Sequence, residues 1–104
     1  MTKLIDILNR EIKLTDERRT HFEENHPELI NQQKKIEETL SNPLIIIQSN
    51  TDLDVELFYK YYDSTPVTSK YMCVVVKVLT KDAFIITAYF TDTIKKGDIL
   101  WIKK

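Results

Sequence analysis

Both histidines of the chain, His21 and His26, lie in one short segment with two adjacent arginines, Arg18 and Arg19. The ordinary pKa of histidine lies near neutral pH, so an imidazole can both accept and donate a proton there. Arginine is a fixed cation whose planar fork matches the oxygens of a phosphate. Such groups can cleave RNA without a metal: a base takes the 2′-hydroxyl proton, an acid protonates the leaving oxygen, and cations stabilise the phosphorane.

The segment that carries these residues predicts a short helix. Thr15 is a favourable N-cap, and the two acidic residues that follow it suit the positive end of the helix dipole. The helix is expected to stop near Asn25, because the residue before Pro27 is pushed away from helical angles.

Spacing on this helix separates the candidate residues. Arg18 and His21 are three residues apart and share a face, whereas His21 and His26 do not. Phe22 is the only large apolar residue of the helix, so polar groups must supply part of its contact surface. Each candidate has a structural alternative: His21 bonded at a helix–sheet boundary, His26 as a helix-end residue, and Arg19 paired with surface acids.

The elements that must position these groups are a second helix and a sheet. Pro27 suits the first turn of the second helix, and a Ser-Asn-Pro sequence ends it at residues 41–43. Its core-facing positions are Leu29, Gln33, Ile36 and Leu40. The chain beyond it predicts strands over residues 44–48, 55–62, 71–79, 84–91 and 99–102. Residues 4–14 predict a short hairpin around Asn9-Arg10, with a helical turn as the alternative for its first half.

This order of elements indicates one α+β domain over residues 1–104. Consecutive strands favour antiparallel pairing, and helices gathered before the strands favour segregated layers. We therefore expect N-terminal helices packed on one face of an antiparallel sheet of about four to five strands, in addition to the short hairpin. The other face of such a sheet stays available for a ligand.

Alternation along the central hairpin predicts which side chains lie on the available face. Even positions are uniformly apolar and should pack on the helices: Met72, Val74, Val76, Val78, Phe84, Ile86, Ala88 and Phe90. Odd positions are mixed: Tyr71, Cys73, Val75, Lys77, Ile85, Thr87, Tyr89 and Thr91. The hydroxyl groups and the Lys77 amine on the odd face could therefore bind substrate.

Composition excludes several other classes of site. Two histidines and one cysteine, widely spaced, match no zinc pattern, and one glycine in the chain leaves no glycine-rich phosphate loop. The single cysteine cannot form a disulfide within the chain and suits a reducing cytoplasm. No membrane segment or leader is expected. A formal net charge of -1 argues against attraction to nucleic acid by bulk charge. We expect no metal and no cofactor.

Several stretches of the chain resemble one known superfamily. The sequence LTDERRTHFEENHPEL followed by ETLSNPLIII resembles small phage and bacterial domains of the barnase–EndoU–colicin–RelE-like (BECR) nucleases. The later stretches SKYMCVVVKV, AFIITAYFT and ILWIKK resemble the strands of the same domains. The resemblance runs from about Ile12 to the end of the chain.

The resemblance implies helices on an antiparallel sheet and a metal-independent, toxin-like ribonuclease whose partners are RNA and a cognate inhibitor or other protein. Carried over by position, the motif residues fall on Arg18, His21, His26, Lys70, Tyr71 and Thr87. In this hypothesis His21 is the general acid or base, and Arg18 and Lys70 hold phosphate. Arg19 occupies a slot that an aromatic residue often takes, which weakens its claim.

A second hypothesis is a non-catalytic protein- or RNA-interaction module on the same fold. The net charge of -1 and the many surface acids motivate it. In this hypothesis the three strand tyrosines, Tyr59, Tyr61 and Tyr62, form a partner patch. In the ribonuclease hypothesis, Tyr71, Thr87 and Tyr89 position substrate or donate hydrogen bonds. The ribonuclease hypothesis predicts that Arg18, His21 and Thr87 converge on one open cleft, whereas a buried His21 bonded to backbone favours the interaction module.

Overall fold

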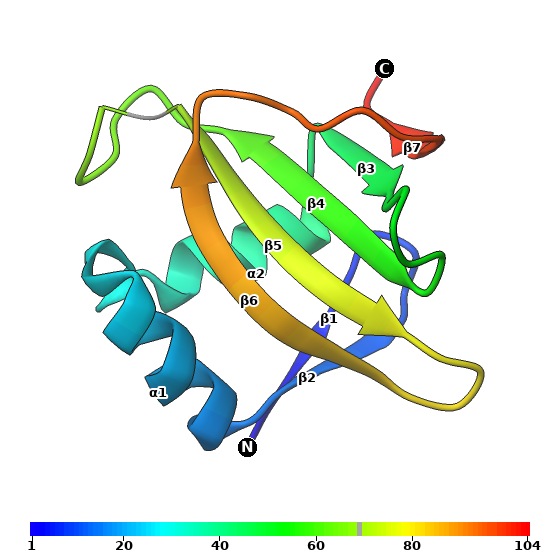
Figure 1. Ribbon diagram of the computed structural model, residues 1–104, viewed down its shortest axis with the longest axis horizontal. Helices are drawn as coiled ribbons and strands as arrows, with labels where there is room; N and C mark the ends of the chain where they lie inside the picture. The colour runs from blue at the N-terminus through cyan, green and yellow to red at the C-terminus, as the bar shows by residue number, and fades with distance from the viewer. Residues whose placement is uncertain (69) are drawn as a thin grey trace.

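A computed structural model describes residues 1–68 and 70–104. Over these residues the chain forms an α+β fold with a seven-stranded mixed sheet and two α-helices (Figure 1). The elements are β1 (Thr2–Ile5), β2 (Glu11–Leu14), α1 (Asp16–Asn25), the 3₁₀ helix η1 (Pro27–Leu29), α2 (Gln33–Ser41), β3 (Ile45–Gln48), β4 (Val55–Tyr61), β5 (Tyr71–Val78), β6 (Ala83–Thr91) and β7 (Ile99–Ile102). No helix in the described part of the chain is long and apolar enough to cross a membrane.

The sheet is larger than expected and is not purely antiparallel. Its strand order is β1-β2-β6-β5-β4-β3-β7, and the β2–β6 pair is parallel, with Lys13 opposite Phe84. The predicted N-terminal hairpin is present as β1 and β2. The prediction of four or five strands was wrong because this hairpin joins the main sheet through β6. Such a contact between distant segments leaves no local signal in the sequence.

The first helix begins and ends where the sequence predicts. The Thr15 side chain accepts a hydrogen bond from the Arg18 backbone N–H at 3.1 Å, and α1 ends at Asn25. The second helix differs from the prediction. Pro27 begins only the short η1, and Asn31, with a φ of 66°, separates η1 from α2. A left-handed residue interrupts a helix, which is why α2 starts later than expected.

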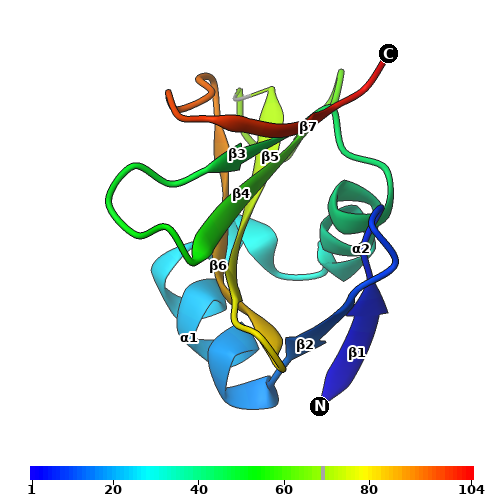
Figure 2. The same ribbon diagram turned by 90° about the vertical axis from the view of Figure 1, so that its right-hand side faces the viewer.

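The two helices lie in different places relative to the sheet. Figure 2 shows α2 on one side of the sheet and the β3–β4 loop projecting from the other. We call the side that faces α2 the inner face and the opposite side the outer face. Helix α1 packs beside β6, which pairs with β2 through one residue pair only, Lys13 with Phe84, so that most of this strand edge has no strand beside it (Figure 1). The expectation that both helices cover one face was therefore wrong for α1.

The main core lies between α2 and the inner face. It includes Phe22, the one buried residue of α1, which is 1% exposed, and Ile36 and Leu40 of α2. Burying one such phenylalanine stabilises the fold by about 2 kcal/mol. A helix with one apolar contact cannot cover a sheet face, which explains why α1 lies at the edge.

A bulge in β6 changes which side chains face outward. Val75 lies opposite Thr87 and Val76 opposite Ile85, so Ile86 is an extra residue on β6. Ile85 packs in the main core, and Ile86 packs in a second apolar cluster on the outer face, which we call the outer cluster. The strict even–odd assignment was correct along β5 and wrong for Phe84, Ile85 and Ile86, since Phe84 lies opposite Lys77 of the outer face. An inserted residue re-aims the side chains around it.

The connection between β6 and β7, residues 92–98, is fixed against the outer face. The Lys95 backbone N–H donates to the Tyr59 hydroxyl at 3.1 Å, and the Asn50 side chain donates to the Lys96 carbonyl at 3.0 Å. The Gln48 N–H donates to the Asp98 carbonyl at 2.8 Å. Ile94 packs against the outer cluster. These contacts hold the connection over residues of β3 and β4.

A buried ion network fixes the N-terminal hairpin to β4. Asp6 is 4% exposed and accepts from the Arg10 Nε at 2.8 Å. The two terminal nitrogens of Arg10 donate to the Glu56 carboxylate at 3.1 and 2.7 Å. Glu56 and Asp6 both raise the pKa of Arg10, Glu56 more strongly. A bidentate pair of this kind fixes orientation as well as position.

Candidate functional site

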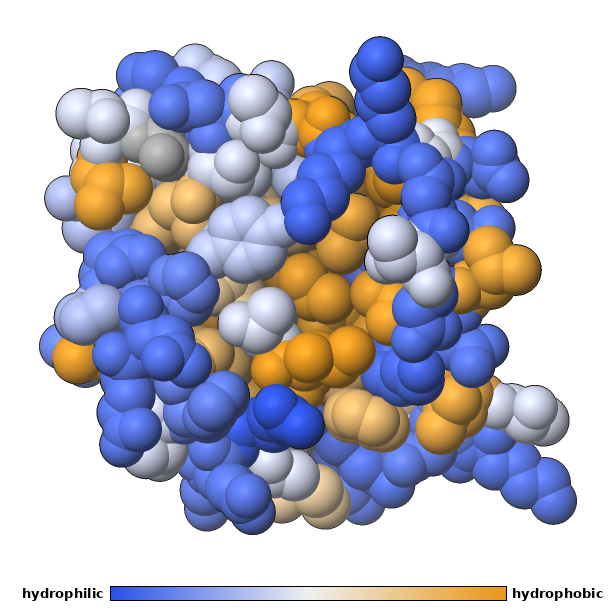
Figure 3. Space-filling view, in the orientation of Figure 1, coloured by the Kyte–Doolittle hydropathy of each residue, from blue (hydrophilic) through white to orange (hydrophobic). Residues whose placement is uncertain are grey.

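The outer face carries a cavity of about 430 Å³. Its floor is apolar, from Val55, Leu57, Val75 and Ile86. Its rim is polar and includes Ser49, Asn50, Thr51, Asp52, Thr87, Tyr89, Lys95 and Lys96. Figure 3 shows the same arrangement, with apolar residues at the centre of this face and hydrophilic ones around them. The cavity can hold a ligand that has both an apolar surface and a polar or charged group.

Three segments far apart in the chain build this cavity. The β6 bulge places Ile86 and Thr87 together on its lining, where strict alternation would separate them. The β3–β4 loop supplies Asn50, and the β6–β7 connection supplies Lys95 and Lys96. Because the backbone around both lysines is hydrogen-bonded, their side chains start from fixed positions on the rim.

A row of protonated groups crosses the outer face beside the cavity. Tyr59, Cys73 and Tyr89 lie directly opposite one another on β4, β5 and β6, and the thiol contacts both phenols. Burial raises the pKa of Tyr59 to about 12 and that of Cys73 to about 11, and it also raises the pKa of Tyr89. At neutral pH Tyr89 is therefore a hydroxyl donor, and Cys73 is an inert thiol rather than a nucleophile.

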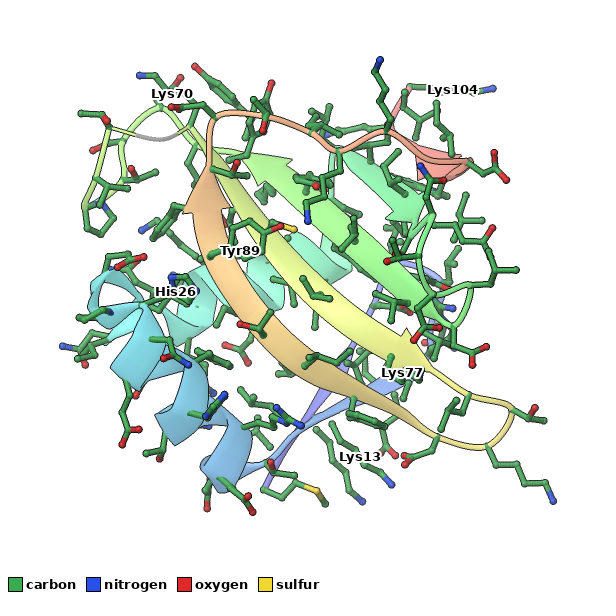
Figure 4. The ribbon with its side chains drawn as sticks, viewed as in Figure 1. Lys13, His26, Lys70, Lys77, Tyr89 and Lys104 are labelled. Atoms are coloured by element: carbon green, nitrogen blue, oxygen red, sulfur yellow. The ribbon has the colours of Figure 1, made fainter. Side chains whose placement is uncertain are left out.

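His26 lies next to this row, at the end of α1. Its ring centroid is 6.1 Å from that of Tyr89, with a tilt of 34° (Figure 4). Its Nδ1 atom lies 3.4 Å from a Glu28 carboxylate oxygen, and the side chain is half-buried. A carboxylate beside Nδ1 favours a proton on that nitrogen and leaves Nε2 able to accept one. His26, for which the sequence offered a helix-end role as the structural alternative, is thus the histidine beside the open face.

Arg18 and His21 lie elsewhere. Both are exposed on α1, and the His21 Nε2 is 3.4 Å from the Asn25 side-chain nitrogen. His21 lines a shallow depression with Asp16, Glu17, Thr20 and Glu24, and it is not among the residues that line the outer cavity. Three carboxylates around one depression oppose the approach of a phosphate. The structure does not bring this pair and Thr87 to one cavity.

Lys70 and Tyr71 lie at the start of β5. Lys70 is exposed, and its carbonyl accepts from the Tyr62 N–H at 2.8 Å. Tyr71 is half-buried and packs edge-on against Tyr61, with ring centroids 5.8 Å apart. Neither residue lines the outer cavity. Their contacts are those of strand residues at a sheet end.

Lys77 is engaged in an ion pair at the opposite end of β5. Its Nζ is 2.6 Å from an Asp52 carboxylate oxygen and 3.9 Å from one of Asp54. The hydrogen bond raises the pKa of Lys77 and lowers that of Asp52. This pair links the β3–β4 loop to β5 near the cavity rim. Lys77 is therefore better explained as a support for that loop than as a substrate ligand.

The three strand tyrosines do not form one patch. Tyr59 is 0% exposed and belongs to the outer cluster, whereas Tyr62 packs against the inner core. The Tyr62 hydroxyl donates to the Glu38 carboxylate at 2.8 Å. Only Tyr61 of the three is exposed. The predicted partner patch was therefore wrong, because Tyr62 follows the end of β4 and faces α2.

The sequence prediction missed most of the cavity rim. Lys95, Lys96 and Asn50 were not among the residues that the sequence predicted for the site. The usable signal was a pair of lysines before the only glycine, Gly97, in a connection between strands. No group of three or more potential metal ligands occurs among residues 1–68 and 70–104.

Comparison of the chain with protein-family models, with curated proteins and with solved structures found no match. Membership of the BECR superfamily therefore stays a prediction that rests on the motif residues. A fold alone does not determine function, so the outer cavity and its surroundings carry the functional information.

Proposed function

We propose that the protein binds single-stranded RNA and holds one nucleotide unit in the outer cavity. The observation that carries this proposal is the pairing of an apolar floor with a rim of two lysines and several hydrogen-bonding side chains. The volume of about 430 Å³ suits a small ligand unit, since such sites span roughly 300–1,000 Å³. Proteins recognise RNA mainly through unstacked bases in single strands.

The parts of a nucleotide match the parts of the cavity. The flat base packs on Leu57, Val75 and Ile86, and its edge meets the Asn50 amide and the Thr87 hydroxyl. The phosphate is held by the ammonium groups of Lys95 and Lys96, which act as point charges. This division resembles the usual combination of an apolar platform for bases with cations along the backbone.

The charge distribution sets the expected salt dependence. The chain has a formal net charge of -1, so binding cannot depend on overall attraction. If two phosphates are neutralised, the logarithm of the binding constant falls with the logarithm of salt concentration with a slope of about -1.4, roughly 0.7 for each phosphate of a single strand. A much steeper slope indicates a different, more extended surface.

Fluorescence polarisation with a labelled oligouridylate of ten nucleotides tests the proposal. Replacing both Lys95→Gln and Lys96→Gln should weaken binding and flatten the salt slope towards zero. Thr87→Val should weaken binding without changing the slope. The matched control is Lys103→Gln with Lys104→Gln, which removes the same charge outside the cavity. The proposal is contradicted if both double variants lose RNA affinity equally, or if neither of them loses any.

A second candidate function is metal-independent RNA cleavage, and the Glu28–His26–Tyr89 arrangement favours it. In this proposal His26 replaces His21 as the general acid or base, Glu28 orients its ring, and the Tyr89 hydroxyl donates to the phosphorane. The His26 side chain is half-buried beside the open face, whereas His21 is exposed among carboxylates. This assignment moves the ribonuclease hypothesis to a different histidine.

Cleavage is tested with the same RNA in a chelating buffer. We expect a cyclic 2′,3′-phosphate product, and a loss of about 100- to 10,000-fold in rate on His26→Ala, the range of one proton-transfer group. His21→Ala is the matched control and should cleave like the unmodified protein. If all three preparations give the same trace activity, the catalytic proposal fails while RNA binding can still hold.

A further inference from the structure

The last strand of the sheet, β7, presents a free edge. It lies at the end of the strand order and pairs only with β3 among the residues that the structure describes (Figure 1). Ile99, Leu100 and Ile102 are 57%, 43% and 46% exposed. An exposed apolar edge strand is a template for another strand, and proteins usually block such edges with charge, proline or a covering element.

The strand is nevertheless held firmly on its inner side. Trp101 packs against the main core, and it lies opposite Ile46 of β3. The Lys103 N–H donates to the Leu44 carbonyl at 2.9 Å. Since backbone groups alternate along a strand, the N–H and C=O of Ile102 point away from β3, towards the free edge. The edge is therefore ordered before any partner arrives.

A bulge in the pairing of β3 with β7 places two apolar side chains of β7, those of Ile99 and Ile102, on the same face of the sheet. The pairing of β3 with β7 shifts so that Ile47 lies opposite Ile99 and Ile45 opposite Ile102. Ile45 and Ile47 belong to the outer cluster, so Ile99 and Ile102 both extend the outer apolar surface to the edge of the sheet. A strand added here gains apolar contacts as well as backbone hydrogen bonds.

The opposite edge of the sheet is protected, which makes β7 distinctive. Strand β1 carries Lys3 within it, 3.8 Å from the Glu11 carboxylate. A lysine inside an edge strand is a common device against pairing. Strand β7 has the sequence Ile-Leu-Trp-Ile and no charged residue within it. Its charges lie outside the strand, at both ends.

Those charges indicate the kind of strand that fits. Residues 95–104 contain four lysines and one acid, Asp98, with lysine pairs before and after β7. A second copy of the chain, paired antiparallel, would bring Lys96 of one copy towards Lys104 of the other. Like charges close together oppose that arrangement. An extended segment with acidic residues at its ends meets the lysines favourably instead.

We propose that the β7 edge binds an extended acidic segment of a partner protein, which adds to the sheet as an eighth strand. Backbone hydrogen bonds to the edge supply affinity, apolar side chains beside Ile99 and Ile102 supply contact, and the flanking acids pair with Lys103 and Lys104. This is the β-augmentation mode of peptide recognition. It is independent of RNA binding in the outer cavity.

The probe is a blocked ten-residue peptide of alternating valine and glutamate, titrated into the isotope-labelled protein and followed by NMR. We expect shifts confined to β7 and its neighbours, and slower hydrogen exchange of the Ile102 amide. A peptide of equal charge with proline at each valine position should not bind, because half of its backbone donors are lost and the fixed φ of proline does not fit a paired strand. Equal binding of both peptides overturns the proposal.

Two variants separate the backbone and charge contributions. Ile102→Pro removes a donor that faces only the free edge, a position at which a sheet tolerates proline, and it should abolish the shifts. Lys103→Glu with Lys104→Glu should weaken binding by at least about fivefold, which corresponds to roughly 1 kcal/mol. Lys3→Glu on the β1 edge is the control and should bind unchanged.

The result is decisive even if Ile102→Pro does not fold. In that case the charge variant and the Ile102 exchange rate in the unmodified protein decide the question. Unchanged binding by the charge variant, or no protection of the Ile102 amide, overturns the proposal. So does concentration-dependent dimerisation through β7, measured by light scattering, because a second copy then occupies the edge.

Discussion

Replacing Gly97→Ala should both destabilise the protein and weaken ligand binding at the outer cavity. A Cβ atom at this position would lie 2.3 Å from the Gln48 carbonyl oxygen and 2.7 Å from the Ile47 Cγ2. The first neighbour is backbone, so the β6–β7 connection or β3 must move. Three hydrogen bonds attach that connection, through Lys95, Lys96 and Asp98. At roughly 1 kcal/mol each, their loss amounts to about 3 kcal/mol.

Urea unfolding measures this effect directly. Trp101, the only tryptophan, lies on β7 close to the substitution and reports unfolding by its fluorescence. The control is Asp98→Ala, which removes an exposed side chain at the next residue but keeps the backbone carbonyl that Gln48 uses. A free energy of unfolding for Gly97→Ala within about 0.5 kcal/mol of the unmodified protein would refute the reasoning. The same variant should lose RNA affinity, because both rim lysines shift.

Three further outcomes follow from buried groups. Arg10→Met leaves the Asp6 carboxylate buried without its cation and should lower the free energy of unfolding, measured with urea, by about 3–5 kcal/mol. The double variant that also carries Asp6→Asn should regain most of that free energy. The pKa of Tyr59 is raised from 10.0 to about 12 and that of Cys73 from 9.0 to about 11. Groups whose pKa is raised by folding stabilise the protein fully at any pH below their unfolded pKa. The free energy of unfolding should therefore be constant up to about pH 9 and fall between about pH 9 and 12. A free energy of unfolding that stays constant across this range, measured with urea, contradicts the raised pKa values of Tyr59 and Cys73. At pH 8 the Cys73 thiol should react with a disulfide reagent only after urea is added, and rapid reaction of the native protein would show that the thiol is accessible.

Local chemistry made the helical part of the fold predictable. The Thr15 cap and the effect of Pro27 are interactions within a few residues, so the bounds of α1 could be read from the sequence. The inward positions of β5 were also correct, because alternation holds wherever a strand is regular. The start of α2 was missed because the left-handed residue Asn31 gave no clear signal.

The errors arose where distant segments meet. The parallel contact of β2 with β6, which enlarges the sheet, depends on how the whole chain folds. The bulge at Ile86 depends on the pairing with β5, and it redirected the lining of the cavity. The sequence left His26 as either a motif residue or a helix-end residue, and its position beside Tyr89 follows from where α1 packs on β6. Spacing on the helix favoured His21, because the tertiary packing that brings His26 to Tyr89 leaves no local signal in the sequence.

The parallel contact of β2 with β6 also has a consequence for the order of folding. Synthesis produces the β1–β2 hairpin well before its partner strand β6. Two strands alone are marginally stable in water. The hairpin therefore cannot be stabilised until β6 has formed. Bringing β2 and β6 together closes a long loop, which costs entropy before the contact is made. We expect folding on the scale of milliseconds to seconds, as for proteins dominated by non-local pairing, with β1 and β2 joining the sheet late.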